Sequence, residues 1–127
     1  MNNDTLGKLG EKWMAGWLKQ QGWQILFHRW RCHWGEIDLI ALTPEPHILV
    51  FIEVKTRSDR SWDAGGLLAI TSKKQQRLRQ AAMLFMGQNP DWADCPCRFD
   101  IALIHCQGNA KLGYRLSLHQ HLEAAFE

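Results

Sequence analysis

The feature that most constrains the fold of this chain is an unbroken apolar run, Ile48 to Ile52, that ends in charged residues. Apolar and polar residues do not alternate along the run, so both faces of the corresponding strand need to be covered, as in the centre of a sheet. Glu53 and Lys55 follow directly at its far end. We therefore predict a central strand from His47 to Thr56 that carries its charged residues only at its C-terminal end.

A first amphipathic helix is predicted near the N-terminus. Its apolar residues recur at three- and four-residue steps, which is the period of one helix face: Leu6, Leu9, Trp13, Met14 and Trp17. Asp4 or Thr5 can cap its first turn, because a short polar side chain accepts hydrogen bonds from the free N–H groups there. Gly22 is expected to end it.

A second amphipathic helix is predicted after the central strand. Ser58 to Gly66 is polar and contains two adjacent glycines, so a mobile loop is expected before the helix. Thr71 or Ser72 caps the helix, and Asn89-Pro90 stops it. Its apolar stripe consists of Leu78, Ala81, Ala82 and Phe85.

The remaining segments are predicted to be strands. Trp23 to Phe27 and Glu36 to Leu42 form a pair joined by a turn, and the prolines of Thr43 to Pro46 make the next segment a loop. Arg98 to Cys106 forms another strand, followed by a shorter one from Leu112 to Leu116 and by a weak helical turn at the end. The order is helix, three strands, helix and two strands, which predicts an α/β (α+β) fold with a central mixed sheet flanked by helices.

Length and composition favour one soluble domain. The 127 residues, 46% of them hydrophobic and 22% charged, are typical of a single globular domain covering residues 1–127. No apolar stretch approaches the roughly 20 residues that cross a bilayer, and Met1 to Lys8 is polar with no apolar signal core behind it. We expect a cytoplasmic protein that does not contact membranes. Its four cysteines are expected to be reduced thiols rather than a zinc site, since only Cys95 and Cys97 lie close in sequence.

The basic residues are unevenly distributed along the chain. A formal net charge of +2 is too small by itself to indicate a nucleic-acid-binding protein. Between Lys55 and Arg79, however, seven basic residues stand against two acidic ones, so this segment can face phosphates. The candidates for contacting a substrate phosphate are Arg57, Lys73, Lys74 and Arg77.

Four charged residues on two adjoining strands predict a functional site. Side chains alternate between the faces of a strand, so Glu36 shares a face with Asp38, and Glu53 shares a face with Lys55. If the two strands pair, all four side chains can come together. Such charges at the end of a buried strand are costly unless they pair with one another or bind a metal ion.

These residue types suit magnesium chemistry. Mg²⁺ prefers carboxylate and backbone oxygen ligands and accepts a substrate phosphate as a further ligand. Asp38, Glu53 and the backbone carbonyl of Val54 could supply the protein ligands, and Lys55 could orient or deprotonate an attacking water whose pKa the metal lowers. The alternative is structural: Glu53 and Lys55 form a surface ion pair at the end of a strand.

Two motifs in this region resemble a known family. Gly35-Glu-Ile-Asp-Leu-Ile and Val50-Phe-Ile-Glu-Val-Lys-Thr-Arg57 look like the signature of the YraN-like family, an uncharacterised family grouped with the PD-(D/E)XK nucleases. They are also similar to archaeal Holliday-junction resolvases. Further matches are Gly7-x-x-Gly-Glu11 with Ala15, a basic second helix with Ala81-Ala82, and Arg98-Phe-Asp100. The resemblance spans most of the chain, from Gly7 to Ile104.

The resemblance implies a restriction-endonuclease-like domain that hydrolyses phosphodiester bonds in DNA, including branched or structured DNA, with Mg²⁺ or Mn²⁺. Residue by residue, it implies Asp38 and Glu53 as metal ligands and Lys55 as the catalytic lysine. Glu11 matches an acidic residue that touches the metal through water, although a solvated helical glutamate accounts for its spacing equally well. Trp62-Asp-Ala-Gly-Gly66 departs from the family pattern, which leaves the shape of this loop and its role in gripping substrate open.

Several assignments stay open at this level. Glu36 can support Asp38 or hold a basic neighbour, and Arg98 and Asp100 can form a strand-end ion pair or contact substrate. Three tryptophans can stack on unpaired bases or cover the edge of the core: Trp30, Trp34 and Trp62. The alternative to an enzyme is a non-catalytic module that binds nucleic acid or another partner. A homodimer is expected if two strands are cut symmetrically, since one domain offers one site.

Overall fold

The computed structural model describes residues 3–58 and 70–127 of the chain. The loop predicted from Ser58 to Gly66, with its departure at Trp62, lies outside the described residues apart from Ser58. The side chain of Asp4, one of the two candidate caps of the first helix, also lies outside them. Within the described ranges, no helix is long and apolar enough to cross a membrane, and the four cysteines are free thiols.

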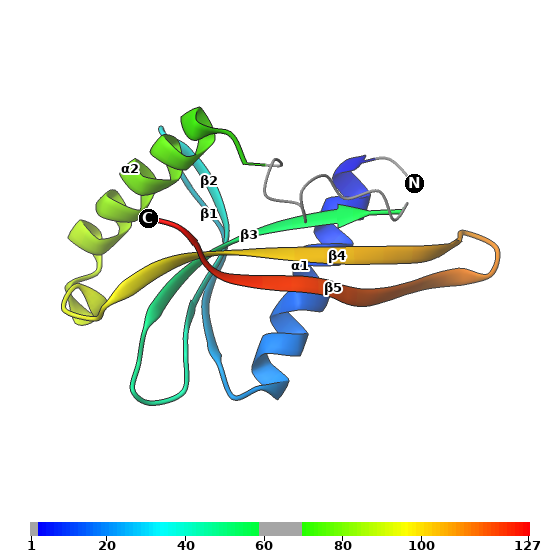
Figure 1. Ribbon diagram of the computed structural model, residues 1–127, viewed down its shortest axis with the longest axis horizontal. Coiled ribbons are helices and arrows are strands. Elements are labelled where there is room, and N and C mark those ends of the chain that lie inside the picture. The colour runs from blue at the N-terminus through cyan, green and yellow to red at the C-terminus, as the bar shows by residue number, and fades with distance from the viewer. Residues whose placement is uncertain (1–2, 59–69) are drawn as a thin grey trace.

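Along the described residues, two α-helices and five strands follow one another in the predicted order (Figure 1). They are α1 (Asn3–Gln20), β1 (Gln24–Cys32), β2 (Gly35–Leu42), β3 (Leu49–Arg57), α2 (Ser72–Gln88), β4 (Cys97–Asn109) and β5 (Gly113–Phe126), with a 3-10 turn, η2 (Pro90–Trp92), after α2. This confirms the α/β (α+β) class and the order αβββαββ. Thr71 caps α2, because its hydroxyl accepts a hydrogen bond from the Lys74 N–H.

The five strands form one mixed sheet in the order β1-β2-β3-β4-β5. β3 and β4 are parallel, and the other neighbours are antiparallel. β3 is the central strand, as its continuous apolar run predicts, and its residues from Leu49 to Val54 are buried. α2 lies in the connection from β3 to β4, since parallel neighbours need a crossover that returns the chain to the same end of the sheet.

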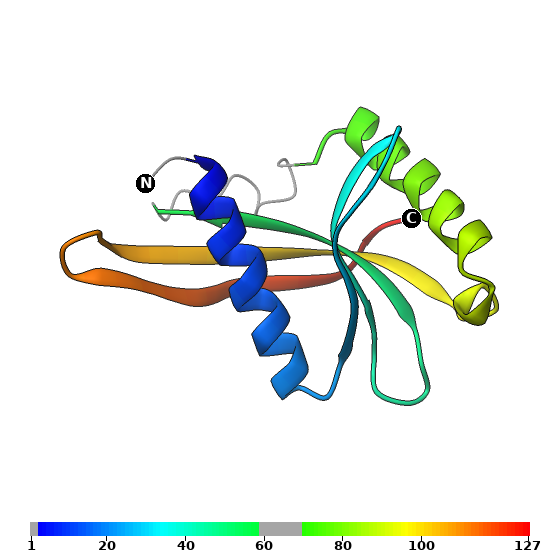
Figure 2. The ribbon, with the colours of Figure 1, turned by 180° about the vertical axis from the view of Figure 1, so that it is seen from behind.

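The two helices cover opposite faces of the sheet (Figures 1 and 2). On one face, Phe85 of α2 packs edge-on against Phe51 of β3. On the other face, Leu18 of α1 shares a buried core with Ile52 of β3. Alternate residues of β3 therefore point to different helices, and by the same alternation Glu53 continues the face that α2 covers.

The end of the chain differs from the prediction. The prediction of a short strand from Leu112 to Leu116 followed by a helical turn is wrong at its end, because β5 runs for 14 residues, from Gly113 to Phe126. β5 pairs with the 13-residue β4 along this length, which gives its backbone groups partners. Leu118 packs against the core beneath α1, and the Phe126 ring stacks on Phe99. Strand pairing and burial therefore override a weak local preference for helix.

Gly10 allows α1 to approach β3 closely. A methyl group at this position would overlap with the side chain of Thr56, a β-branched residue with little freedom to rotate away. Glu11 is the next residue, so the same close approach brings Glu11 towards the end of β3. By contrast, a methyl group at Gly16 of the same helix would meet no atom within 4 Å.

We expect Gly10→Ala to destabilise the protein and Gly16→Ala to stabilise it. Alanine gains about 0.5–1 kcal/mol over glycine inside a helix, but at position 10 the overlap with Thr56 costs about 1–3 kcal/mol. The net loss at position 10 should be on the order of 1 kcal/mol in the free energy of unfolding, measured with urea. Equal stabilisation by both substitutions would show that α1 is not held this close to β3.

Candidate functional site

The candidate site forms where β2 and β3 separate. The two strands pair as far as Leu39 opposite Ile52, where the ladder ends. One residue further, the Asp38 carboxylate takes the place of the backbone partner, because its Oδ2 accepts a hydrogen bond of 2.8 Å from the Val54 N–H. Since both backbone groups of an extended residue point to the same side, the Val54 carbonyl is expected to face the gap beside Asp38.

Glu11 and Glu36 approach Asp38 from α1 and from the start of β2. One carboxylate oxygen from each of these three residues, here called the acidic cluster, lies within 4.8 Å of the other two, so the cluster could hold a cation. Arg29 Nε on β1 lies 2.7 Å from Glu11 Oε2 and 3.8 Å from Glu36 Oε1. Arg31 Nε lies 3.0 Å from the other oxygen of Glu36. Two arginines thus counter part of the negative charge.

Glu53 lies on the α2 side of the same gap. Its side chain is only 6% exposed, and its Oε1 lies 2.7 Å from Lys74 Nζ and 3.7 Å from Lys55 Nζ. Its other oxygen, Oε2, is buried and has no hydrogen-bond partner in the part of the chain that the structure describes. An unsatisfied buried polar atom costs about 1–3 kcal/mol, more if it is charged, and a bound cation would offset that cost.

The charges of the site act on one another's protonation. Burial, followed by the charges of Glu53 and Glu11, raises the pKa of Asp38 from 3.8 to about 8. Burial, followed by the neighbouring Lys74 ammonium, lowers the pKa of Lys55. Burial also acts to lower the pKa of Lys74, but the Glu53 carboxylate outweighs it, so that the pKa of Lys74 is raised. Lys74 is therefore the cation paired with Glu53, and Lys55 is the lysine that loses its proton more easily.

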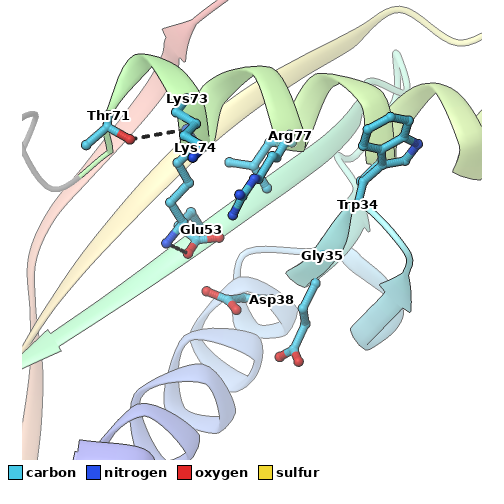
Figure 3. Close-up of a pocket in the computed structure, with 11 residues that line it drawn as sticks. Trp34, Gly35, Asp38, Glu53, Thr71, Lys73, Lys74 and Arg77 are labelled. Carbon is cyan, nitrogen blue, oxygen red and sulfur yellow. Dashed lines mark hydrogen bonds and ion pairs between the residues drawn. The ribbon is translucent and has the colours of Figure 1, made fainter.

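Asp38 and Glu53 line a cleft of about 570 Å³ between α2 and the strands (Figure 3). Its basic wall is formed by three residues of α2: Lys73, Lys74 and Arg77. Arg77 points from the helix into the cleft. The volume lies within the roughly 300–1,000 Å³ of pockets that hold small ligands. The cleft therefore presents basic side chains to a ligand that its carboxylates could bind through a cation.

The structure brings together most of the predicted site residues. The gap between β2 and β3 collects the candidates for catalysis and metal binding: Glu11, Asp38, Glu53, Val54 and Lys55. Arg57, a predicted substrate contact, lies at the exposed end of β3 and does not line the cleft. Lys74 does line it but is paired with Glu53, a contact that motif spacing does not reveal.

Arg29 is a site residue that the sequence motifs do not indicate. Its ion pairs with Glu11 and Glu36 arise because β1 pairs with β2 and α1 crosses the sheet beside them. Only a prediction of which strands pair could have identified Arg29 from the sequence. Glu36, which the sequence leaves open, lies in the acidic cluster itself.

Arg98 and Asp100 belong to a separate cluster away from the cleft. Asp100 is fully buried and accepts hydrogen bonds from Arg98 Nε at 3.0 Å and from the Ala124 N–H at 2.9 Å. His121 Nε2 lies 2.8 Å from its other oxygen. Neither Arg98 nor Asp100 lines the cleft. These contacts favour the ion-pair alternative, with Asp100 fixing the end of β5.

Asp38→Asn should stabilise the metal-free protein at high pH. Because the pKa of Asp38 is raised to about 8 in the folded state, the folded state holds this proton more tightly than the unfolded state, and stability falls as pH rises from about 4 to about 8. The amide removes this loss and can still accept the Val54 hydrogen bond. Urea unfolding in EDTA should show a gain on the order of a few kcal/mol at about pH 8 that shrinks towards about pH 4.

Asp94→Asn, at an exposed position, is the matched control and should show no such trend. A gain for Asp38→Asn that does not depend on pH would mean that the Asp38 carboxyl is not perturbed in the folded protein.

Comparison with known proteins identifies the family of this chain. Residues 10–104 match the model of the uncharacterised protein family UPF0102. A UPF0102 protein of Synechococcus sp. (strain JA-3-3Ab) is 50% identical over 121 residues, which cover 95% of this chain and 89% of that protein. A UPF0102 protein of Nostoc sp. (strain PCC 7120) is 42% identical over 136 residues, covering 100% of this chain and 97% of that protein. These matches confirm the resemblance to the YraN-like family, and the chain belongs to the uncharacterised protein family UPF0102.

Proposed function

We propose that this protein is a nuclease that hydrolyses phosphodiester bonds in DNA with Mg²⁺ or Mn²⁺. The observation that carries the proposal is the convergence of Asp38 and Glu53, with Lys55 beside them, at the end of the central strand and against a basic cleft wall. Such an arrangement could bind a cation and a phosphate together. The resemblance to PD-(D/E)XK nucleases and archaeal resolvases suggests branched or structured DNA as the substrate, which is an argument from analogy.

The donor set of the site fits a hard divalent cation. Asp38, Glu53 and the Val54 carbonyl would hold the cation. Glu11 lies close enough to Asp38 to contact the same cation through a water molecule. Glu53 Oε2, which has no partner within residues 3–58 and 70–127, and Asp38, whose pKa is raised, both mark places where a cation would relieve an unfavourable arrangement of charge. When bound, the ion would lower the pKa of water and offset the charge that builds on the phosphate.

The chain's own side chains would position the substrate and move the proton. Lys73 and Arg77 on the wall of the cleft would attract the phosphate backbone. Lys55 is suited to accept a proton from water at its Nζ, because its lowered pKa increases the neutral fraction. Lys74 would orient the Glu53 carboxylate through their 2.7 Å contact.

The alternative is a binding module that keeps the fold without turnover. One observation favours it: Lys74 and Arg29 already pair with Glu53 and Glu11, so part of the negative charge is countered without a metal ion. Such a module would bind nucleic acid or a protein partner through the cleft. Lys55 distinguishes the two functions, because proton transfer requires it and binding through the cleft does not.

Cleavage assays test the enzyme directly. Labelled single-stranded, duplex, flap, fork and four-way-junction DNAs are incubated with Mg²⁺ or Mn²⁺ and with wild type, Glu53→Gln or Lys55→Met. We expect metal-dependent cutting by wild type that Glu53→Gln abolishes and that Lys55→Met slows about 10²- to 10⁴-fold. Glu45→Gln, at an 88% exposed side chain, is the control and should cut normally. Binding without cutting under every condition would favour the non-catalytic module.

Two carboxylate sets could hold the ion, and variants separate them. The pair Asp38 and Glu53 is expected rather than Asp38 with Glu11 and Glu36. Among the described residues, Glu53 Oε2 has no hydrogen-bond partner, whereas both carboxylate oxygens of Glu36 lie near an arginine. Glu53→Gln should therefore remove the stabilisation that Mg²⁺ or Mn²⁺ causes, and Glu36→Gln should keep most of it. At a free ion concentration about 100 times Kd, this stabilisation is about 2.7 kcal/mol, measured as a rise in melting temperature.

The reverse pattern, with Glu36→Gln abolishing the rise in melting temperature, would place the ion in the acidic cluster. A wild-type protein that neither ion stabilises would have no metal site of useful affinity, and the nuclease proposal would fail with it.

A further inference from the structure

We propose that Trp34 stacks on an unpaired base, so that the nucleic acid entering the cleft is single-stranded where it meets Trp34. This inference rests on the proposed nuclease function and specifies its substrate. It comes from a division of the cleft into two chemically different ends (Figure 3). Glu53 and Lys74 stand at one end, and Trp34 stands at the other, extending from the β1–β2 turn towards α2.

The division of the cleft matches the two halves of a nucleotide. The carboxylates and the basic residues Lys73 and Arg77 suit a phosphate with its counter-ion. Apolar side chains of α2, Leu78 and Ala81, line the same cleft as the Trp34 ring and suit the flat face of a base. A phosphate bound near Glu53 would therefore direct its base towards Trp34.

Trp34 differs from the other tryptophans that the structure describes. It is 38% exposed, whereas the others within residues 3–58 and 70–127 are partly buried. Trp30 packs edge-on against Phe85, with ring centroids 5.4 Å apart, so it covers the core. The two alternatives that the sequence leaves open are thus separated: Trp30 has a core partner, and Trp34 presents its ring to a cleft.

The β1–β2 turn holds the Trp34 ring at the cleft. Gly35 lies opposite Cys32 in the strand pair and has a φ of +130°, a conformation that favours glycine. His33 and Trp34 form the two residues of the turn, and their ring centroids lie 4.4 Å apart. A ring that is already ordered loses less entropy when a ligand stacks on it.

Stacking on Trp34 requires an unpaired base. In a duplex each base face is covered by its neighbours, so a side chain reaches it only in a single-stranded segment or after the base has left the stack. Lys73 and Arg77 lie exposed on the α2 wall and would add attraction that does not depend on sequence. The substrate class that follows is nucleic acid with an unpaired segment beside the phosphate that is cut.

Binding measurements in EDTA, where no strand is cut, test the proposal by fluorescence anisotropy. The probes are a labelled DNA single strand, an RNA of the same sequence and the matching DNA duplex. Trp34→Ala should weaken single-strand binding about 5- to 100-fold, the range that stacking on one aromatic residue supports, and should leave duplex affinity unchanged. Trp34→Phe keeps a ring and should recover most of the loss.

Tyr114→Ala is the matched control. Tyr114 is 37% exposed, close to the value for Trp34, but it lies in the β4–β5 hairpin, which projects away from α2 (Figure 1). Its loss should change neither affinity. A strand with one abasic position at a time locates the stacked base: where the missing base is the one that meets Trp34, wild type should lose affinity and Trp34→Ala should lose nothing further.

Three outcomes would overturn the proposal. They are unchanged single-strand affinity in Trp34→Ala, an equal loss for single strand and duplex, and the absence of single-strand binding by wild type. The melting temperature of each variant verifies that it is folded, and Trp34→Phe gives a second comparison if Trp34→Ala is not. Failure of the proposed nuclease function would give a different result. Stacking without cutting would indicate a module that binds single strands, whereas cutting that Trp34→Ala does not affect would indicate a nuclease without this contact.

Discussion

The hydrogen bond from the Val54 N–H to Asp38 Oδ2 allows two central strands to separate at the candidate site without leaving a buried backbone donor unpaired. Where β2 leaves β3, the Val54 N–H would otherwise lose its strand partner, and an unpaired backbone donor at a buried residue is costly. The carboxylate replaces that partner and keeps the gap open. Side chains from both helix-covered faces can then meet there, with Glu11 arriving from α1 and Lys74 from α2.

The negative charge gathered in the gap between β2 and β3 lowers the stability of the fold. Burial and repulsion raise the pKa of Asp38 to about 8, and one oxygen of Glu53 is buried without a partner among the described residues. Arg29 and Lys74 counter part of this charge. The apolar cores on both faces of β3 support the arrangement, because the burial of their side chains offsets its cost. A cation bound here, as proposed, would offset this cost, so that stability is exchanged for function.

The supporting elements place chemistry of different kinds around this gap. The missing side chain at Gly10 lets α1 lie against Thr56 and brings Glu11 to the acidic cluster. One side of α2 carries the apolar residues that pack in the core, and the neighbouring side carries basic residues. The helix that stabilises the sheet therefore also forms the wall of the cleft. The β1–β2 turn adds Trp34 to that cleft. One charged region and one apolar region therefore line the same cleft.

The amino-acid sequence by itself determined most of the elements and selected the residues that meet at the centre of the candidate site. The apolar run into Glu53 identified the central strand, helical periodicity identified α1 and α2, and strand alternation together with the family motifs selected Asp38, Glu53 and Lys55. Each of these depends on residues close together in the chain. Tertiary structure decided the length of β5, the pairing of Glu53 with Lys74, the part played by Arg29 and the exposure of Trp34. These depend on which distant segments pair and pack, and local propensity does not encode a contact between side chains that only the folded sheet brings together.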